Sequence, residues 1–310
     1  MTSQAQLESW KQLRQALEGP RPIAVAGHVR PDGDCIGSQV ALTRVLRALG
    51  HEAVAINRHG IPRNMRPLTG DTPFANPANF DPDAHAVVCV DCADKGRLGL
   101  DFAPRFGGIT GNIDHHVSNS HYASINIVEP AAVATAFVLA KLFFSDGVPV
   151  DATTAQALYL GIATDTAYFR YAPATPALFE LCAELVRCGA NPGLVADTLQ
   201  AHEPWSRVEL QHRFFASLRR ELDGRVCIGI LRQADFDATG ASREEAEGLV
   251  EHTRDIAGVD VGVLLEDLES GRGAKGSLRA GGEVGGMDQL AAHFGGGGHA
   301  RAAGFTFHEP

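Results

Sequence analysis

Short apolar runs alternate with helix-like segments through the first 114 residues of this chain. The runs PIAVAG (22–27), EAVAIN (52–57), HAVVCVD (85–91) and ITGNID (109–114) are typical of strands. Between the first two runs, GSQVALTRVLRALG (37–50) predicts a helix that ends at Gly50. Strands that alternate with helices favour a parallel sheet with helices packed on it. The sequence therefore predicts an α/β fold, with helical segments continuing from Ala131 to about Gly189.

The chain is long enough for two domains, since 310 residues exceed the usual size of one hydrophobic core. The periodic pattern breaks near Pro192 and Pro204, so we expect a larger N-terminal domain over 1–190, a linker over 191–205 and a smaller α/β domain over 206–310. In the smaller domain, helices are predicted near 205–221, 242–258 and 287–294. Strands are predicted at 225–231, 259–267, 273–280 and 301–307.

Acids and histidines stand at the ends of the buried-looking segments of the N-terminal part. They are His28, Asp32, Asp34, Asp91, Asp114, His115, His116 and Asp165. In open α/β sheets ligands bind beyond strand ends, and imidazoles with several carboxylates suit octahedral Mn²⁺ or Mg²⁺ more than structural zinc. We therefore expect a dinuclear metal site that hydrolyses phosphate esters. The alternative is that each acid caps a turn or a helix.

Charge and hydropathy exclude some partners. The net charge of −10 argues against binding to long duplex nucleic acid, although a local pocket can still take a short anionic substrate. No apolar stretch approaches the roughly 20 residues of a membrane span, and residues 1–19 predict an amphipathic helix, not a signal peptide. We expect a cytoplasmic protein with no membrane partner. Its six cysteines are expected to be reduced, and Cys35 lies beside Asp34 in the expected metal loop.

A second cluster lies near the C-terminus, where the four glycines of Gly295–Gly298 precede His299. Such a run is expected to exclude regular helix and strand, and it lets backbone amides approach a phosphate. Arg279 in the strand-like KGSLRA adds a donor suited to bidentate phosphate contacts. The alternatives are a flexible turn for the glycines and a solvated strand charge for Arg279.

Together these motifs resemble a known family. His28-x-x-Pro31-Asp32-Gly33-Asp34, the Asp91 of VDCAD, Asp114-His115-His116 and the Asp165 of GIATDTAYFR are similar to the metal-site motifs of the DHH phosphoesterases. GSLRA with FGGGGHARAAGF resembles the C-terminal DHH-associated domain. The similarity extends from about residue 20 to 307. It is greatest to the nanoRNase type, the bifunctional oligoribonucleases and pAp phosphatases.

The resemblance implies a role for each matching residue. One Mn²⁺ would be bound by His28, Asp32 and Asp91, and a second by Asp34, Asp91, His115 and Asp165, with Mg²⁺ as the other cation to consider. His116 would contact the scissile phosphate and Asp114 would orient the imidazoles. In the C-terminal domain, across an interdomain cleft, the substrate-binding groups would be Arg279, His299 and the amides of Gly296, Gly297 and Gly298.

The expected activity is hydrolysis of RNA fragments of about two to five nucleotides to nucleoside 5′-monophosphates, and of pAp to AMP. A hydroxide between the two cations would be the nucleophile. Two other functions stay open: a phosphodiesterase for cyclic di-AMP or linear dinucleotides, and a non-enzymatic dinucleotide sensor. The assembly is open as well, with a homodimer as one option.

Overall fold

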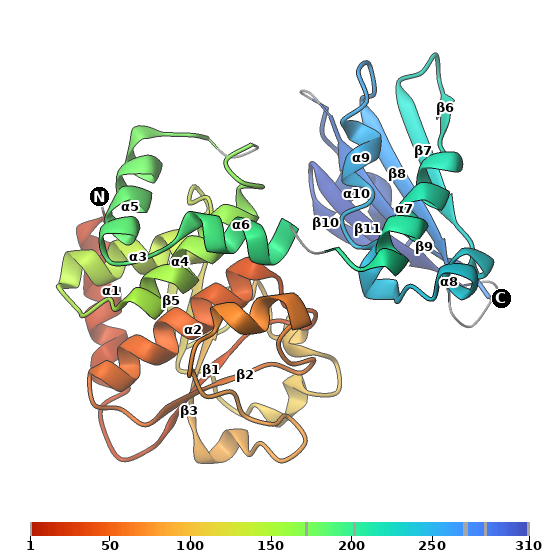
Figure 1. The fold of residues 1–310 in the computed structure, drawn as a ribbon. Coiled ribbons are helices and arrows are strands. Elements are labelled where there is room, and N and C mark those ends of the chain that lie inside the picture. Colours follow the sequence, from red (N-terminus) through yellow and green to blue (C-terminus); the bar gives the residue numbers. More distant parts are fainter. Residues whose placement is uncertain (1, 171–172, 201–202, 269–271, 282–283, 309–310) are drawn as a thin grey trace. The chain divides into compact units, whose positions relative to one another are not determined.

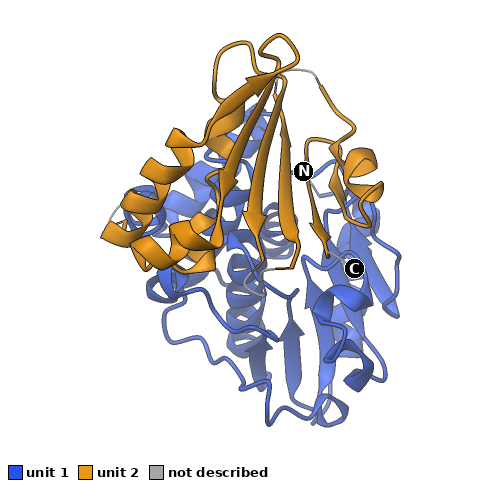
Figure 2. Ribbon diagram, turned by 90° about the vertical axis from the view of Figure 1, so that its right-hand side faces the viewer, with its two compact units in different colours: residues 1–201 blue, residues 202–310 orange. Residues whose placement is uncertain are grey.

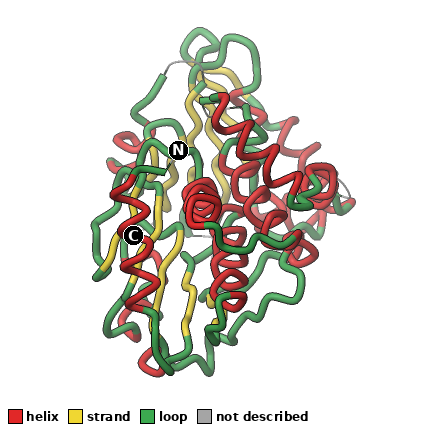
Figure 3. Tube along the Cα trace, turned by 90° about the vertical axis from the view of Figure 1, so that its left-hand side faces the viewer, coloured by secondary structure: helices red, strands yellow, loops and turns green. Residues whose placement is uncertain are grey.

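The chain forms two compact units, Met1–Ala201 and His202–Pro310, in a computed structural model (Figures 1 and 2). The structure describes residues 2–170, 173–200, 203–268, 272–281 and 284–308. Both units combine helices with strands, which confirms the predicted α/β class (Figure 3). Among the helices within these ranges, none is long and apolar enough to cross a membrane.

The first unit contains a five-stranded parallel sheet. Its strands are β1 (Ile23–Ala26), β2 (Ala53–Ile56), β3 (Ala86–Val90), β4 (Gly111–Asp114) and β5 (Ile125–Val128). Their order is β2-β1-β3-β4-β5, and every neighbouring pair is parallel. The first four strands were predicted and β5 was not. This order reverses direction between β1 and β3, and such a switch point is where open parallel sheets bind ligands beyond their carboxyl ends.

The two faces of this sheet pack against different structures. Ile23 and Val25 of β1 face a core built with the helices α1 (Gln4–Ala16), α2 (Gly33–Ala48), α3 (Thr135–Asp146), α4 (Ala152–Asp165) and α5 (Pro176–Arg187). Ala24 and Ala26 alternate to the other face, where Phe102 and Phe106 pack. The 3₁₀ helices of this unit are η1 (Arg63–Leu68), η2 (Pro82–Ala84), η3 (Lys95–Leu98) and η4 (Ala103–Arg105).

Glycines let α2 and α4 approach closely. A Cβ atom at Gly37 of α2 would lie 2.3 Å from the carbonyl oxygen of Ala157 on α4, and one at Gly161 of α4 would lie 2.6 Å from Oδ1 of Asp34 on α2. Both distances are far shorter than ordinary carbon contacts of about 3.5–4.0 Å. The close crossing places the start of α2 beside the end of α4, and both of these helix ends carry predicted metal ligands.

Two parts of the first unit differ from the prediction. Helix α2 begins at Gly33 with Asp32 as its N-cap, so Asp34 lies in the first helical turn and not in a loop. The segment expected to be a linker contains helix α6 (Pro192–Gln200). Pro192 is the first residue of α6, a position at which proline is favoured because its missing N–H would have no helical partner.

The second unit is built on a six-stranded mixed sheet. Its strands are β6 (Arg219–Glu221), β7 (Val226–Leu231), β8 (Val261–Asp267), β9 (Ala274–Ala280), β10 (Gly297–His299) and β11 (Ala302–Phe307), in the order β10-β11-β9-β8-β7-β6. Its helices are α7 (Trp205–Ala216), α8 (Gln233–Thr239), η5 (Arg243–Ala246), α9 (Glu251–Arg254) and α10 (Met287–Ala292). The four strands predicted here are confirmed as β7, β8, β9 and β11.

Three predictions for the second unit were wrong. The helix expected near 205–221 ends at Ala216, because Arg219–Glu221 form β6 and pair with β7. The helix expected over 242–258 is divided into η5 and α9, because Gly248 between them has a φ of 81°. The glycine run does not exclude a strand, because Gly297 and Gly298 pair with Gly304 and Ala303 in the edge strand β10. Position 298 favours glycine, because residues with a side chain rarely adopt its φ of 148°.

Candidate metal centre and phosphate site

Three parallel strands deliver the candidate ligands to one edge of the sheet. His28 follows β1, Asp91 follows β3, and Asp114 ends β4 with His115 and His116 directly after it. Because the carboxyl ends of parallel strands meet at the same edge, these side chains converge at the switch point between β1 and β3. The start of α2 adds Asp32 and Asp34, and the last residue of α4 adds Asp165.

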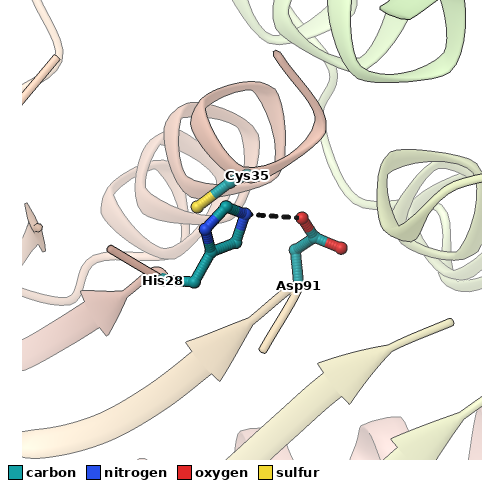
Figure 4. Close-up of side chains that lie close together, drawn as sticks. All are labelled: His28, Cys35 and Asp91. Carbon is teal, nitrogen blue, oxygen red and sulfur yellow. Dashed lines mark ion pairs between the residues drawn. The ribbon is translucent and has the colours of Figure 1, made fainter. Parts of the chain in front are cut away.

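Asp91 lies at the centre of this cluster. One of its carboxylate oxygens lies 3.4 Å from Nε2 of His28 (Figure 4), and the other lies 3.7 Å from Nε2 of His115. Thr135 donates its hydroxyl to the same carboxylate over 3.0 Å. The backbone of Asp91 has a φ of 54°, a left-handed conformation that is uncommon outside glycine. Such strain is concentrated at functional sites, where the surrounding structure holds it in place.

Asp34 is buried and receives hydrogen bonds from the start of α3. The N–H groups of Thr135 and Ala136 donate to its two oxygens over 2.6 and 2.8 Å. A Cβ at Gly161 would lie 2.6 Å from the Asp34 Oδ1, so glycine is required on α4 at this point. Burial, followed by the negative charges of Asp91 and Asp165, raises the pKa of Asp34. The carboxylate therefore lies where additional positive charge would stabilise it.

His115 and Asp165 complete one side of the cluster. Nε2 of His115 lies 3.3 Å from Asp165, 3.7 Å from Asp91 and 3.9 Å from Asp34. Its Nδ1 donates to the carbonyl of Ala132 over 3.2 Å, which leaves the lone pair on Nε2 directed at the carboxylates. Burial raises the pKa of Asp165 to about 7 although the neighbouring His115 lowers it, and the negative charge of Asp91 adds to the rise.

His28 has the same arrangement on the other side. Its Nδ1 donates to the carbonyl of Val29 over 2.8 Å, and its buried Nε2 has no hydrogen-bond partner among the described residues. Asp32 lies 3.7 Å from that Nε2 and caps α2 by accepting from the N–H of Cys35 over 3.0 Å. Histidines that bind metals usually donate their other ring N–H to a carbonyl or carboxylate, so both His28 and His115 fit that role.

His116 differs from its neighbour because both of its ring nitrogens have protein partners. Its Nδ1 lies 2.8 Å from Asp114 Oδ1, and its Nε2 lies 2.9 Å from a guanidinium nitrogen of Arg97. Asn119 donates to the other oxygen of Asp114 over 2.6 Å. Burial alone would raise the pKa of Asp114, but the hydrogen bonds from His116 and Asn119 keep it below its usual range. Asp114 therefore stays an anion that orients His116.

The donor set fits divalent cations. Among the residues that the structure describes, three groups have donor atoms within 4.8 Å of one another: His28, Cys35 and Asp91; Asp91, His115 and His116; and Asp34, His115 and Asp165. Asp91 and His115 each belong to two groups, as a pair of neighbouring ions requires. Nitrogen and oxygen donors dominate, and the thiol of Cys35 is fully buried with a pKa raised by burial. A neutral thiol is a poor ligand, so the set favours Mn²⁺ or Mg²⁺.

The sequence did not predict three hydrogen bonds to the candidate site residues, which come from Thr135, Asn119 and Arg97. Thr135 and Asn119 carry neutral side chains that no metal-ligand pattern selects. A signal for Asn119 exists in hindsight, because an amide five residues after Asp114 can reach back to a carboxylate at a strand end.

Two of the predicted substrate-binding residues, Arg279 and His299, share one face of the sheet in the second unit. Arg279 on β9 pairs with Ala302 on β11, which in turn pairs with His299 on β10. Directly opposed residues point to the same face, so Arg279 and His299 lie in one row with Ala302 between them. Arg279 donates through Nε to Glu251 over 2.5 Å and through a terminal nitrogen to its neighbour's carbonyl over 3.0 Å.

The glycine amides are not equivalent. Gly296 donates its N–H to the carbonyl of Ala291 over 2.9 Å, which removes it from the amides that could bind a phosphate. A Cβ there would lie 2.2 Å from the carbonyl oxygen of Gly304, so its lack of a side chain serves packing. Gly297 has open space at its Cβ position and lies with Gly298 on the exposed edge strand.

Comparisons with known proteins agree with this geometry. A family described as "DHH family, N-terminal domain" matches residues 22–162. The chain is 33% identical to the bifunctional oligoribonuclease and PAP phosphatase of Thermus thermophilus, over 96% of this chain and 89% of that protein. It is 24% identical to the Bacillus subtilis protein of the same name, over 92% and 89% of the two chains.

Solved structures show the same fold. An exopolyphosphatase-related protein from Bacteroides fragilis superposes with a TM-score of 0.89 at 23% identity, over 99% of this chain and 92% of that one. RecJ from Thermus thermophilus, in complex with Mn²⁺, superposes with a TM-score of 0.54 at 15% identity, over 99% and 52% of the two chains. This chain belongs to the DHH family of metal-dependent phosphoesterases, together with proteins named bifunctional oligoribonuclease and PAP phosphatase.

Proposed function

We propose that this protein hydrolyses very short RNA fragments to nucleoside 5′-monophosphates and pAp to AMP, with two divalent cations and a preference for Mn²⁺. The observation that carries the proposal is Asp91, a strained and buried carboxylate that two imidazoles approach from opposite sides. Relatives named as oligoribonucleases and PAP phosphatases across nearly the whole chain support this substrate class, and a RecJ of the same fold binds Mn²⁺.

The residues divide into two ligand sets. His28, Asp32 and Asp91 would hold one cation, and Asp34, Asp91, His115 and Asp165 the other, with Asp91 shared. Bound there, the cations supply the charge that activates water and neutralises phosphate oxygens. The protein fixes the orientation of its imidazole ligands. The carbonyls of Val29 and Ala132 accept the Nδ1–H of His28 and His115, which leaves each Nε2 available to a cation. Pre-oriented donors need no reorganisation during the reaction.

His116 would lie beside the scissile phosphate. Asp114 and Asn119 hold its imidazole through consecutive hydrogen bonds of 2.8 and 2.6 Å, so its orientation does not depend on the substrate. Asp114 therefore acts as a positioning residue for His116.

Residues 206–310 would bind a second phosphate or a nucleotide of the substrate, and residues 1–190 would carry the chemistry. Arg279 and His299 share one sheet face, and the exposed residues Gly297 and Gly298 precede His299 on the edge strand β10. Guanidinium, imidazole and amide groups are the usual donors to phosphates. A linker over 191–205, the interdomain cleft and a cytoplasmic location stay predictions.

An assay of Mn²⁺-dependent hydrolysis with pApA, pAp and cyclic di-AMP tests the proposal. We expect turnover of pApA and pAp, and loss of turnover in Asp91→Ala at saturating Mn²⁺. Asp151→Ala is a matched control, since that carboxylate caps α4 and pairs with Arg44, away from the cluster. Preference for cyclic di-AMP would favour the cyclic dinucleotide phosphodiesterase, and tight binding without turnover would favour a sensor. Turnover by Asp91→Ala would exclude the dinuclear centre.

A further inference from the structure

Arg97 is a cation at the metal centre to which the proposed mechanism assigns no role. It lies in η3, six residues after Asp91, and its side chain is half-buried. Its guanidinium reaches Nε2 of His116 over 2.9 Å. Its carbonyl accepts from the N–H of Val29 over 2.8 Å, which ties η3 to the loop that carries His28 and Asp32. Arg97 is thus connected to both sides of the cluster.

The direction of this hydrogen bond is fixed by chemistry. A guanidinium carries five N–H donors and no acceptor, so His116 must accept through Nε2. The ring proton of a neutral His116 then lies on Nδ1 and points to Asp114. In this arrangement His116 offers no N–H to a phosphate. Of this pair, Arg97 is the residue that still has side-chain N–H groups to offer to a phosphate.

We propose that Arg97 contacts the scissile phosphate directly, and that Asp114 and His116 position its guanidinium for this contact. One terminal nitrogen of the planar fork bonds His116, and the remaining donors are suited to two phosphate oxygens. The inference rests on the proposed phosphoesterase function and adds a substrate contact to it. His116 then acts on the phosphate through Arg97.

The surroundings support a phosphate contact over a purely structural one. A cation that served only to neutralise the acids would bond a carboxylate, whereas Arg97 donates to an imidazole nitrogen. His116 offers the guanidinium a hydrogen-bond acceptor but no negative charge. A bound phosphate would supply that negative charge.

The test compares Arg97→Met with Arg187→Met in the full-length chain. Arg187 is an exposed arginine on α5 that pairs with Glu184, so its loss removes the same charge away from the centre. The readouts are kcat/KM for pAp, competitive inhibition by inorganic phosphate, and Mn²⁺ binding by calorimetry. We expect Arg97→Met to lose about 100-fold in kcat/KM and about 10-fold in phosphate affinity, with Mn²⁺ affinity within about 3-fold of wild type.

Phosphate affinity in Arg97→Met equal to that of wild type would overturn the inference, as would a loss of Mn²⁺ affinity as large as the loss of phosphate affinity. If Arg97→Met does not fold, Arg97→Gln replaces it, because the amide keeps a donor for His116 and lacks the charge. If the wild-type chain hydrolyses neither pAp nor pApA, the proposed function fails. The phosphate-binding comparison still decides the role of Arg97 in that case.

Discussion

Replacing Gly161 by alanine tests whether the close crossing of α2 and α4 builds the metal centre. The new Cβ would lie 2.5 Å from the Cβ of Ala136 and 2.6 Å from Oδ1 of Asp34, and 3.2 Å from the Cα of Asp34. Alanine in a helix interior is favoured over glycine by about 1 kcal/mol. Overpacking of a core costs about 1–3 kcal/mol, and two of these three neighbours cannot rotate away.

The overpacking cost less the gain in helix propensity leaves a net loss of about 0–2 kcal/mol in the free energy of unfolding, and we expect a value near the upper end because two of the neighbours are fixed. For a unit of this size each kcal/mol lowers Tm by about 2–4 °C. The displaced Asp34 should also reduce Mn²⁺ affinity by about 10-fold, the lower end of the effect expected when a ligand loses its orientation. Thermal unfolding by circular dichroism and Mn²⁺ calorimetry measure the two effects.

Gly193→Ala is the control, because a Cβ on this exposed glycine of α6 meets only the side-chain oxygen of Asn191, at 3.3 Å. It should leave Tm unchanged or raise it, with unchanged Mn²⁺ affinity. If Gly161→Ala raised Tm as alanine does on an open helix surface, the packing argument would be wrong. A lower Tm with unchanged Mn²⁺ affinity would show that Gly161 is needed for helix packing but not for the position of Asp34.

Three further outcomes are expected. Ala167→Gly should raise stability by about 1 kcal/mol, measured by chemical denaturation, because Ala167 has a φ of 48° and begins three consecutive left-handed residues; an unchanged midpoint would show that the strain is compensated. Asp114→Asn should lower kcat/KM about 10–100-fold with smaller effects on Mn²⁺ binding, and equal losses in both would contradict its role in orienting His116. Arg279→Met should raise KM for pAp without changing Mn²⁺ affinity, and a normal KM would remove Arg279 from the substrate site.

The sequence predicted the parts of the fold that depend on local pattern. PIAVAG and HAVVCVD became β1 and β3 because apolar runs of this length are buried in a parallel sheet. The strand β5 was missed because SINIVE (124–129) contains as many polar as apolar residues, three of each, and its pairing with β4 is a tertiary contact. Gly297 and Gly298 were expected to exclude a strand, but pairing with β11 outweighs their low strand propensity.

The candidate ligands were found from sequence because each follows a strand or ends a helix. Their partners were not, because hydrogen bonds such as that from Thr135 to Asp91 join residues 44 positions apart. The sequence also did not indicate that Asp34 lies within helix α2. Gly33 argues against a helix by propensity, yet a Cβ there would lie 2.3 Å from Thr164 Oγ1, so contact with α4 requires glycine at this point.

The hydrogen bonds from α3 to Asp34 bear on the order in which the protein assembles. A carboxylate buried among other acids would normally oppose folding until a cation arrived. Here the N–H groups of Thr135 and Ala136, at the positive end of a helix, already stabilise that charge. They offset part of the burial and of the repulsion from Asp91 and Asp165 that raise the pKa of Asp34. Part of the cost of building the centre is therefore compensated by α3 during folding, and only the remainder is left for a cation to compensate.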